Sequence, residues 1–329
     1  MYKFALIGGA GVFAVHLTKY LLDNTDASRV ISIGRNRPRS SAFTLDVGKD
    51  DSRYSYHQIH FVFEQDRLLE LFDKEQPEVI INFAALAYAT SWQKSFRYYE
   101  TNVVAVAKLC EQLMSRDYLQ RFVQIGTSEL YGSVNEPVTE EYPVYPTSPY
   151  AVSKLAADLH LDTLWKTCQF PMNIIRPSNA YAPGQLLYRI LPKAVYCGLT
   201  QQKLPLQGGG KVKKSYLHAQ DLARAIYLIA TRAPLGKVYN VGPKEPVSIR
   251  KLVDIVAEKL HISFEKLCNV TESRKGEDAQ YWLDSTRIKE DLDWEPYISL
   301  DEGIQDMIDW GKKYLHILHD EDFEFILHA

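Results

Sequence analysis

A glycine-rich turn between an apolar strand and an amphipathic helix constrains the fold of this chain more than any other feature. Lys3 to Ile7 is a short apolar run, and an apolar-periodic stretch to Leu22 follows the turn. In between, Gly9-x-Gly11-x-x-Ala14 matches the dinucleotide-binding fingerprint with its tolerated terminal Ala. Glycines let the backbone approach a pyrophosphate at the helix N-terminus. The pattern therefore predicts a nicotinamide dinucleotide site at Gly8, Gly9, Gly11, Val12 and Phe13.

Strands and helices alternate along the first half of the chain. Apolar runs predict strands at 29–33, 79–83, 122–125 and 173–175, and periodic stretches predict helices at 95–114 and 150–165. This alternation indicates an α/β fold, a Rossmann-type doubly wound parallel sheet with ligands at the carboxyl ends of its strands.

Beyond Pro183 the sequence becomes richer in loops, with amphipathic helices expected at 222–230, 249–260 and 300–314. We expect a dinucleotide-binding domain over 1–182, to which 215–243 and 284–312 return. The rest of 183–329 should form a smaller, interleaved α/β lobe that binds the substrate.

The end of the second strand bears on the choice between NAD and NADP. An NAD site usually has an acidic residue there for the ribose 2′-hydroxyl, and this chain has Gly34-Arg35-Asn36-Arg37 instead. Arg35, with Arg37 or Arg39 nearby, favours a 2′-phosphate and hence NADP. The alternative is a solvated basic loop.

Composition excludes several classes of partner. The chain has 329 residues, a net charge of −3 and a pI near 6.3, so it lacks the excess of basic residues expected of a protein that binds nucleic acid or a membrane surface. The N-terminus enters a strand directly, and no apolar run reaches membrane-spanning length. Four scattered cysteines and two isolated His pairs predict reduced thiols, a cytoplasmic enzyme and no metal site.

A tyrosine and a lysine four residues apart carry the expected chemistry. Tyr150 and Lys154 lie one turn apart on one helix face, where the Lys cation favours the phenolate. A tyrosine so placed can take a proton from a hydroxyl while hydride leaves the adjoining carbon. Thr127-Ser128-Glu129 follows another expected strand, at the edge of the sheet where ligands bind.

These motifs occur in the order found in one superfamily. From the glycine turn to a point near Trp310, the chain resembles an extended short-chain dehydrogenase/reductase of the nucleotide-sugar-modifying branch. Thr-Ser-Glu at 127–129 is similar to the GDP-mannose 4,6-dehydratases, whereas Asn179 with Gln185 and 191–193 looks like the dTDP-glucose 4,6-dehydratases. UDP-glucuronate decarboxylases can also carry Ser-Glu there. The motifs that carry the resemblance are Gly8–Gly11, Phe83-Ala84-Ala85, Ser91, Thr101-Asn102-Val103, 127–132, 150–154 and 176–181.

The resemblance implies a nucleotide-sugar 4,6-dehydratase with tightly bound NAD or NADP, acting in polysaccharide biosynthesis as a homodimer or homotetramer. Tyr150 would accept the sugar 4-hydroxyl proton, Glu129 would remove the C5 proton, Thr127 would hydrogen-bond the sugar oxygen and Lys154 would hold the cofactor ribose. Ala84, Ala85 and Asn102 would also border the cofactor, and the expected substrate-binding residues are Ser91, Ser128, Asn179, Lys193, Lys214 and Arg274.

Two other functions remain open at this point. A C4 dehydrogenase, epimerase or decarboxylase could use the same scaffold. A nucleotide-sensing protein could have kept the fold without catalysis. In Lys214, moreover, the chain has a lysine where the family has a diphosphate-binding Arg, and a lysine cannot form the same bidentate contact.

Overall fold

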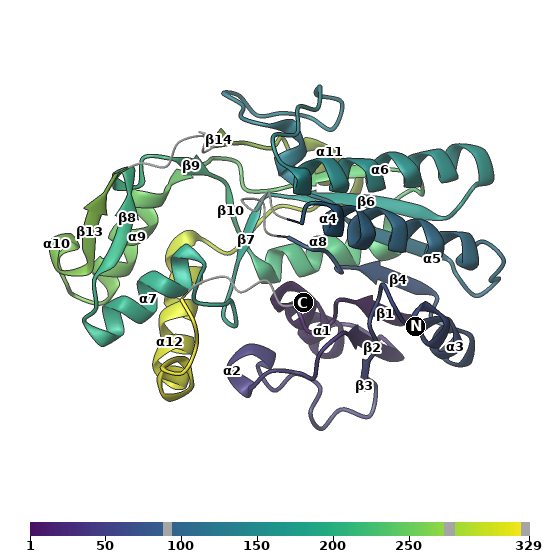
Figure 1. The fold of residues 1–329 in the computed structure, drawn as a ribbon, viewed down its shortest axis with the longest axis horizontal. Coiled ribbons are helices and arrows are strands. Elements are labelled where there is room, and N and C mark those ends of the chain that lie inside the picture. Colours follow the sequence, from purple (N-terminus) through teal and green to yellow (C-terminus); the bar gives the residue numbers. More distant parts are fainter. Residues whose placement is uncertain (88–93, 273–279, 324–329) are drawn as a thin grey trace.

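The computed structural model describes residues 1–87, 94–272 and 280–323. Its centre is a seven-stranded, wholly parallel sheet in the order β11-β6-β5-β4-β1-β2-β3 (Figure 1). The strand order reverses direction beside β1, as in a doubly wound sheet, and the predicted fold class is confirmed. The strands are β1 (Lys3–Ile7), β2 (Arg29–Gly34), β3 (Tyr54–Gln58), β4 (Val79–Asn82), β5 (Arg121–Ile125), β6 (Met172–Pro177) and β11 (Val238–Val241).

Helices cover both faces of this sheet, which explains why its strands are apolar throughout. One face packs on α1 (Val12–Asn24), α8 (Ala219–Arg232) and α11 (Thr286–Leu292). The other packs on α3 (Gln65–Glu75), α5 (Ala105–Leu113) and α6 (Pro149–Cys168). Each face has its own buried cluster of aliphatic and aromatic side chains, and the strand ends emerge between the two layers.

A second lobe follows β6 and has a separate core. Its helices are α7 (Ile190–Thr200), α9 (Ile249–Lys259), α10 (Phe264–Leu267) and α12 (Leu300–Leu318), packed with the short α2 (Ser41–Thr44). Its strands form three small sheets: β7 (Asn179–Tyr181) with β10 (Tyr216–His218), β8 (Leu204–Gln207) with β13 (Cys268–Thr271), and β9 (Lys213–Lys214) with β12 (Val247–Ser248) and β14 (Gln280–Tyr281). The division of the chain at 182/183 stays a prediction.

The helix expected at 95–114 contains an irregular turn. It begins as α4 (Phe96–Tyr99), passes through a π-helical turn at Glu100–Val104 and continues as α5. A π-turn inserts one extra residue and often marks a functional site, and hydrophobic periodicity alone does not reveal it. Here the turn carries Asn102, which is completely buried.

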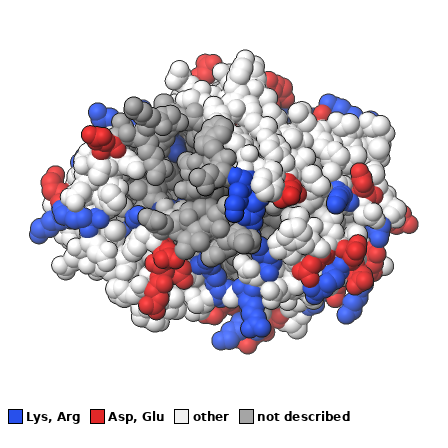
Figure 2. All heavy atoms as spheres, viewed as in Figure 1, with Lys and Arg blue, Asp and Glu red and all other residues white. Residues whose placement is uncertain are grey.

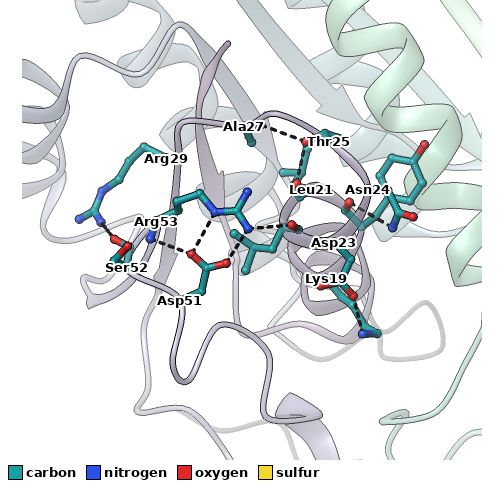
Figure 3. Close-up of polar contacts among 12 residues, drawn as sticks. Lys19, Leu21, Asp23, Asn24, Thr25, Ala27, Arg29, Asp51, Ser52 and Arg53 are labelled. Atoms are coloured by element: carbon teal, nitrogen blue, oxygen red, sulfur yellow. Dashed lines mark hydrogen bonds and ion pairs between the residues drawn. The ribbon is translucent and has the colours of Figure 1, made fainter.

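Asp51 and Arg53, which lie just before β3, fasten this part of the chain to the C-terminal end of α1. The Arg53 guanidinium binds both carboxylate oxygens of Asp51 and donates to the Leu22 carbonyl at the end of α1 (Figure 3). These contacts fix where the chain enters β3 after the loop that follows β2, and so they position the border of the cofactor region.

The surface charge and the hydropathy of the helices agree with what the amino-acid composition predicts. On the face drawn in Figure 2, acidic and basic side chains are interspersed. No helix within the described residues is both long and apolar enough to cross a membrane.

Two buried histidines join α1 to the second lobe. His16 on α1 donates from Nε2 to the Pro183 carbonyl, and its ring meets the ring of His218 edge to face. Burial lowers the pKa of each imidazole to about 4. His16 Nδ1 and His218 Nε2 have no hydrogen-bond partner in the described structure. Both rings are therefore held neutral.

We predict that acid destabilises this contact. A histidine whose pKa is about 4 when folded and about 6.5 when unfolded contributes stability above pH 6.5, and that contribution is lost as the pH falls toward 4. The expected loss is about 2 kcal/mol per histidine between pH 7 and pH 5. Denaturant unfolding across this range should show it. His218→Asn keeps a cap for α8 and should flatten the slope, whereas the exposed control His261→Asn should not. Equal slopes in all three proteins would contradict the prediction.

Candidate active site

The glycine turn forms a cradle for a dinucleotide phosphate. Gly8 has a φ of +83°, and a Cβ there would lie 2.7 Å from the Ala84 nitrogen after β4. A Cβ on Gly9 would lie 2.6 Å from Ser32 Cβ on β2. Gly11 is the N-cap of α1 and provides no side-chain cap, so the first N–H groups of the helix are left for a ligand. The residues present therefore fit a nicotinamide dinucleotide.

The Thr-Ser-Glu segment forms a short 3-10 turn directly after β5. Thr127 caps this turn, its hydroxyl accepting from the Glu129 N–H at 3.2 Å. The same hydroxyl hydrogen-bonds the Tyr150 phenol at the start of α6. The Glu129 carboxylate, on a half-buried residue, acts electrostatically on that phenol. The fold thus brings together Thr127, Glu129 and Tyr150, as the sequence predicted.

Tyr150 is held in an environment that disfavours its ionised form. Burial raises the pKa of the phenol, and the nearby Glu129 carboxylate raises it further. The Thr127 hydrogen bond and the Arg189 guanidinium act in the opposite direction without reversing it. We expected Lys154 to lower this pKa, and the net direction in the protein is upward, because burial removes water that would solvate a phenolate.

Lys154 lies one turn along α6 and is only 1% exposed. Burial lowers the pKa of its ammonium to about 8, while the Asp158 carboxylate opposes that shift. Lys154 is therefore largely charged at neutral pH and loses its charge in the mildly alkaline range.

Asn102 joins the loop after β4 to the start of α6, and its expected place beside the cofactor stays a prediction. Its side chain bonds both the N–H and the carbonyl of Leu86, and it donates to Ser153 Oγ at 2.9 Å. Ser153 in turn donates to the Tyr150 carbonyl. Asn102 thereby ties the loop carrying Ala84 and Ala85 to the first turn of α6, which fixes that loop beside the glycine cradle.

The expected substrate-binding residues are only partly assembled in the described structure. Ser128 is buried in the 3-10 turn, and Asn179 is half-buried on β7. Lys193 on α7 lies over the Phe323 ring of the C-terminal segment, and Lys214 on β9 lies over Tyr281. Ser91 and Arg274 fall outside the described residues.

Sequence reasoning missed Arg189. It is the N-cap residue of α7, on the second lobe, yet its charge acts on Tyr150 of the first. The available signal was a cation just before the 191–193 segment already assigned to substrate binding. Its position places a positive charge where the two lobes face each other at the candidate site.

Comparisons with known proteins agree with this geometry. The family model described as GDP-mannose 4,6 dehydratase matches residues 6–307. The dTDP-D-glucose 4,6-dehydratase of Mus musculus is 27% identical over 321 residues, covering 94% of this chain and 88% of that protein. The crystal structure of dTDP-glucose 4,6-dehydratase from Bacillus anthracis in complex with NAD has a TM-score of 0.87 and 27% identity, covering 96% and 98% of the two chains. UDP-glucuronic acid 4-epimerase from Bacillus cereus, in complex with UDP-glucuronic acid and NAD, has a TM-score of 0.85 and 25% identity, covering 94% and 99%.

Proposed function

The chain belongs to the GDP-mannose 4,6-dehydratase family, and we propose that Thr127, Glu129, Tyr150 and Lys154 perform the dehydration in this protein. It is an extended short-chain dehydrogenase/reductase that binds a nicotinamide dinucleotide and acts on a nucleotide-diphosphate sugar. One observation carries the proposal: a half-buried carboxylate, Glu129, lies beside the Tyr150–Thr127 pair. A 4,6-dehydration needs two bases at neighbouring carbons, and this arrangement offers both.

The first proton transfer belongs to Tyr150. Thr127 hydrogen-bonds the 4-oxygen of the sugar and orients it toward Tyr150, whose phenolate form takes the hydroxyl proton as C4 is oxidised. The glycine turn and Lys154 would hold an oxidised nicotinamide dinucleotide, which would supply the hydride acceptor for C4 and the hydride donor for C6, and a positive charge that would favour the phenolate. The Arg189 guanidinium acts on the Tyr150 phenol and favours its ionised form, and Lys154 contributes a second positive charge one turn along α6.

The second proton transfer belongs to Glu129. A ketone at C4 acidifies the C5 hydrogen, which the Glu129 carboxylate then removes. The hydroxyl at C6 leaves as water, and the proton it needs comes from Glu129, since the buried Ser128 hydroxyl is no acid at neutral pH. Hydride addition at C6 and protonation at C5, which balances the proton taken from the 4-hydroxyl, then give a 4-keto-6-deoxy sugar.

Turnover of a panel of NDP-hexoses and NDP-heptoses, followed by mass spectrometry, tests this function. Loss of water supports it. Loss of carbon dioxide would indicate a decarboxylase, isomerisation without mass change an epimerase, and binding without turnover a sensor. The epimerase is the strongest competitor, because the Bacillus cereus epimerase shares this fold at a TM-score of 0.85. The site favours dehydration over epimerisation, since an epimerase has no use for a base at C5.

The finer choice of cofactor rests on the loop after β2. No carboxylate lies within the exposed 35–40 segment, and Arg35 accepts a hydrogen bond from Gln58 through its carbonyl. A hollow of about 270 Å³ lies between this loop and the glycine turn. It is bordered by Gly9, Ala10, Val15, Pro38, Arg39, Thr44, Asp46, Val47, Lys49, Tyr54 and Tyr56. Arg39 and Lys49 favour a 2′-phosphate there, although the similar dehydratase structure holds NAD.

We predict that the purified protein retains NADP in preference to NAD. Release by denaturation and identification by mass spectrometry would show this directly. Arg35→Ala and Arg39→Ala should each reduce the preference by about tenfold, through loss of one charge-assisted contact. Arg250→Ala, which removes an exposed guanidinium on α9, is the matched control. Retention of NAD alone would overturn the NADP assignment and return these arginines to a solvated loop.

A further inference from the structure

A third titratable residue continues the Tyr150–Lys154 row on α6. Asp158 follows Lys154 by four residues, is 2% exposed, and forms an ion pair with Arg176 Nε on β6 at 3.0 Å. None of the proton transfers described above uses Asp158. A carboxylate buried one turn behind the catalytic lysine is costly to desolvate, so its partners need an explanation.

The ion pair lies beneath both halves of the catalytic site. Arg176 also donates to the Tyr131 hydroxyl at 2.9 Å, and Tyr131 donates to Asn240 on β11 at 2.9 Å. Tyr131 ends the 3-10 turn that carries Glu129. A Cβ on Gly126 would come within 3.4 Å of Asp158 Oδ1. Gly126, which precedes Thr127, therefore packs directly against the ion pair.

The bonding of Asp158 is asymmetric. Its Oδ2 accepts from Arg176, while its buried Oδ1 has no hydrogen-bond partner in the described structure. The carboxylate acts on the Lys154 ammonium and raises its pKa against the lowering effect of burial. The other titratable groups around this face of α6 are Tyr98 on α4, Glu129, Arg176 and Arg189. Among the described residues, Asp158 is the charged group that shifts the pKa of Lys154.

We propose that Asp158 is a positioning residue that keeps Lys154 protonated during sugar oxidation, and that Arg176 limits its effect by sharing the carboxylate. The inference rests on the role proposed above for Lys154. In this arrangement the Asp158–Arg176 pair sets the alkaline limit of the reaction and also supports the turn that holds Thr127 and Glu129. The charge of Lys154 then reflects a balance between two buried neighbours of opposite sign.

The two partners should therefore shift the pH profile in opposite directions. Asp158→Asn should move the alkaline limb of the pH–rate profile for nicotinamide reduction down by about one pH unit. This lowers the rate at pH 8 by about fivefold, with KM for the sugar within about twofold. Arg176→Gln should move the same limb up by about half a unit to one unit, because Asp158 is then free to act on Lys154. A merely structural pair predicts lower melting temperatures and no movement of the limb.

The alkaline limb is measured by stopped-flow spectroscopy, which records the rate of reduction of the bound nicotinamide across pH at saturating nucleotide sugar. Asp291→Asn, which removes a carboxylate bonded to Tyr239 and remote from α6, is the control and should match wild type. The comparison of the two single variants decides the question. If neither folds, the double variant Asp158→Asn/Arg176→Gln, which removes both charges of the ion pair together, should place the alkaline limb below that of wild type.

The affinity for the dinucleotide, measured by calorimetry over the same pH range, separates this inference from the proposed function. It depends on the Lys154 charge and not on any reaction, so its alkaline decline should shift in the same directions even without turnover. Opposite shifts of the two single variants support the inference. An unmoved limb in Asp158→Asn, or shifts of both variants in one direction, overturns it.

Discussion

Replacing Tyr150 by Phe is expected to lower the rate of sugar oxidation by about 10²–10⁴ while leaving nucleotide-sugar affinity nearly unchanged. The ring keeps its packing at the start of α6, including its edge-to-face contact with Tyr98. Only the hydroxyl that accepts the proton, and that hydrogen-bonds Thr127, is lost. The phenylalanine ring has no atom that can accept the proton from the sugar hydroxyl.

Single-turnover reduction of the bound nicotinamide measures the oxidation rate, and calorimetry with the nucleotide diphosphate measures binding. Tyr181→Phe is the control, because Tyr181 is a buried tyrosine whose hydroxyl has no hydrogen-bond partner in the described structure. Its rate should remain close to that of wild type. A Tyr150→Phe protein that reduces the nicotinamide at a near-normal rate would contradict the assignment of Tyr150 as the base.

Replacing Glu129 by Gln should separate elimination from oxidation. Gln keeps the size and the hydrogen-bonding capacity of Glu, and the substitution leaves Tyr150, Lys154 and the glycine cradle untouched. Oxidation at C4 should proceed, but an amide cannot remove the C5 proton at neutral pH. The variant should therefore accumulate reduced nicotinamide with a 4-keto sugar bound and release dehydrated product about 10²–10⁴ times more slowly.

Nicotinamide absorbance and product mass, followed in the same reaction, test this expectation. Glu141→Gln, which removes a carboxylate paired with Arg287 at the surface, should behave like wild type. If Glu129→Gln completes the native reaction at close to the normal rate, Glu129 is not the C5 base.

Local sequence patterns were sufficient to predict the main elements of the fold. The glycine turn, the Tyr150–Lys154 spacing and five strands of the central sheet (3–7, 29–33, 79–83, 122–125 and 173–175) are each encoded within a few consecutive residues, and the structure has them where they were expected. The Thr127–Glu129 segment could be located for the same reason, since it follows a strand that ends at the ligand-binding edge.

Other features depend on contacts between distant parts of the chain. Asn102 is held by Leu86 and Ser153, and Arg176 joins Asp158 to Tyr131 across three elements. Arg39, one of the arginines considered for a 2′-phosphate, pairs with Glu321, which is 282 residues away. The direction of the Tyr150 pKa shift was likewise hidden, because burial, which dominates it, is a property of the folded protein.

The central claim is that hydride leaves C4 and returns to C6 of the same sugar. We would incubate a panel of NDP-hexoses bearing deuterium at C4, including dTDP-glucose and GDP-mannose, with the holoenzyme and analyse the products by mass spectrometry and NMR. The account predicts a product that has lost one water and carries the deuterium in its C6 methyl group. A C4 epimer of unchanged mass, a product that has lost carbon dioxide, or a dehydrated product without deuterium at C6 would contradict it.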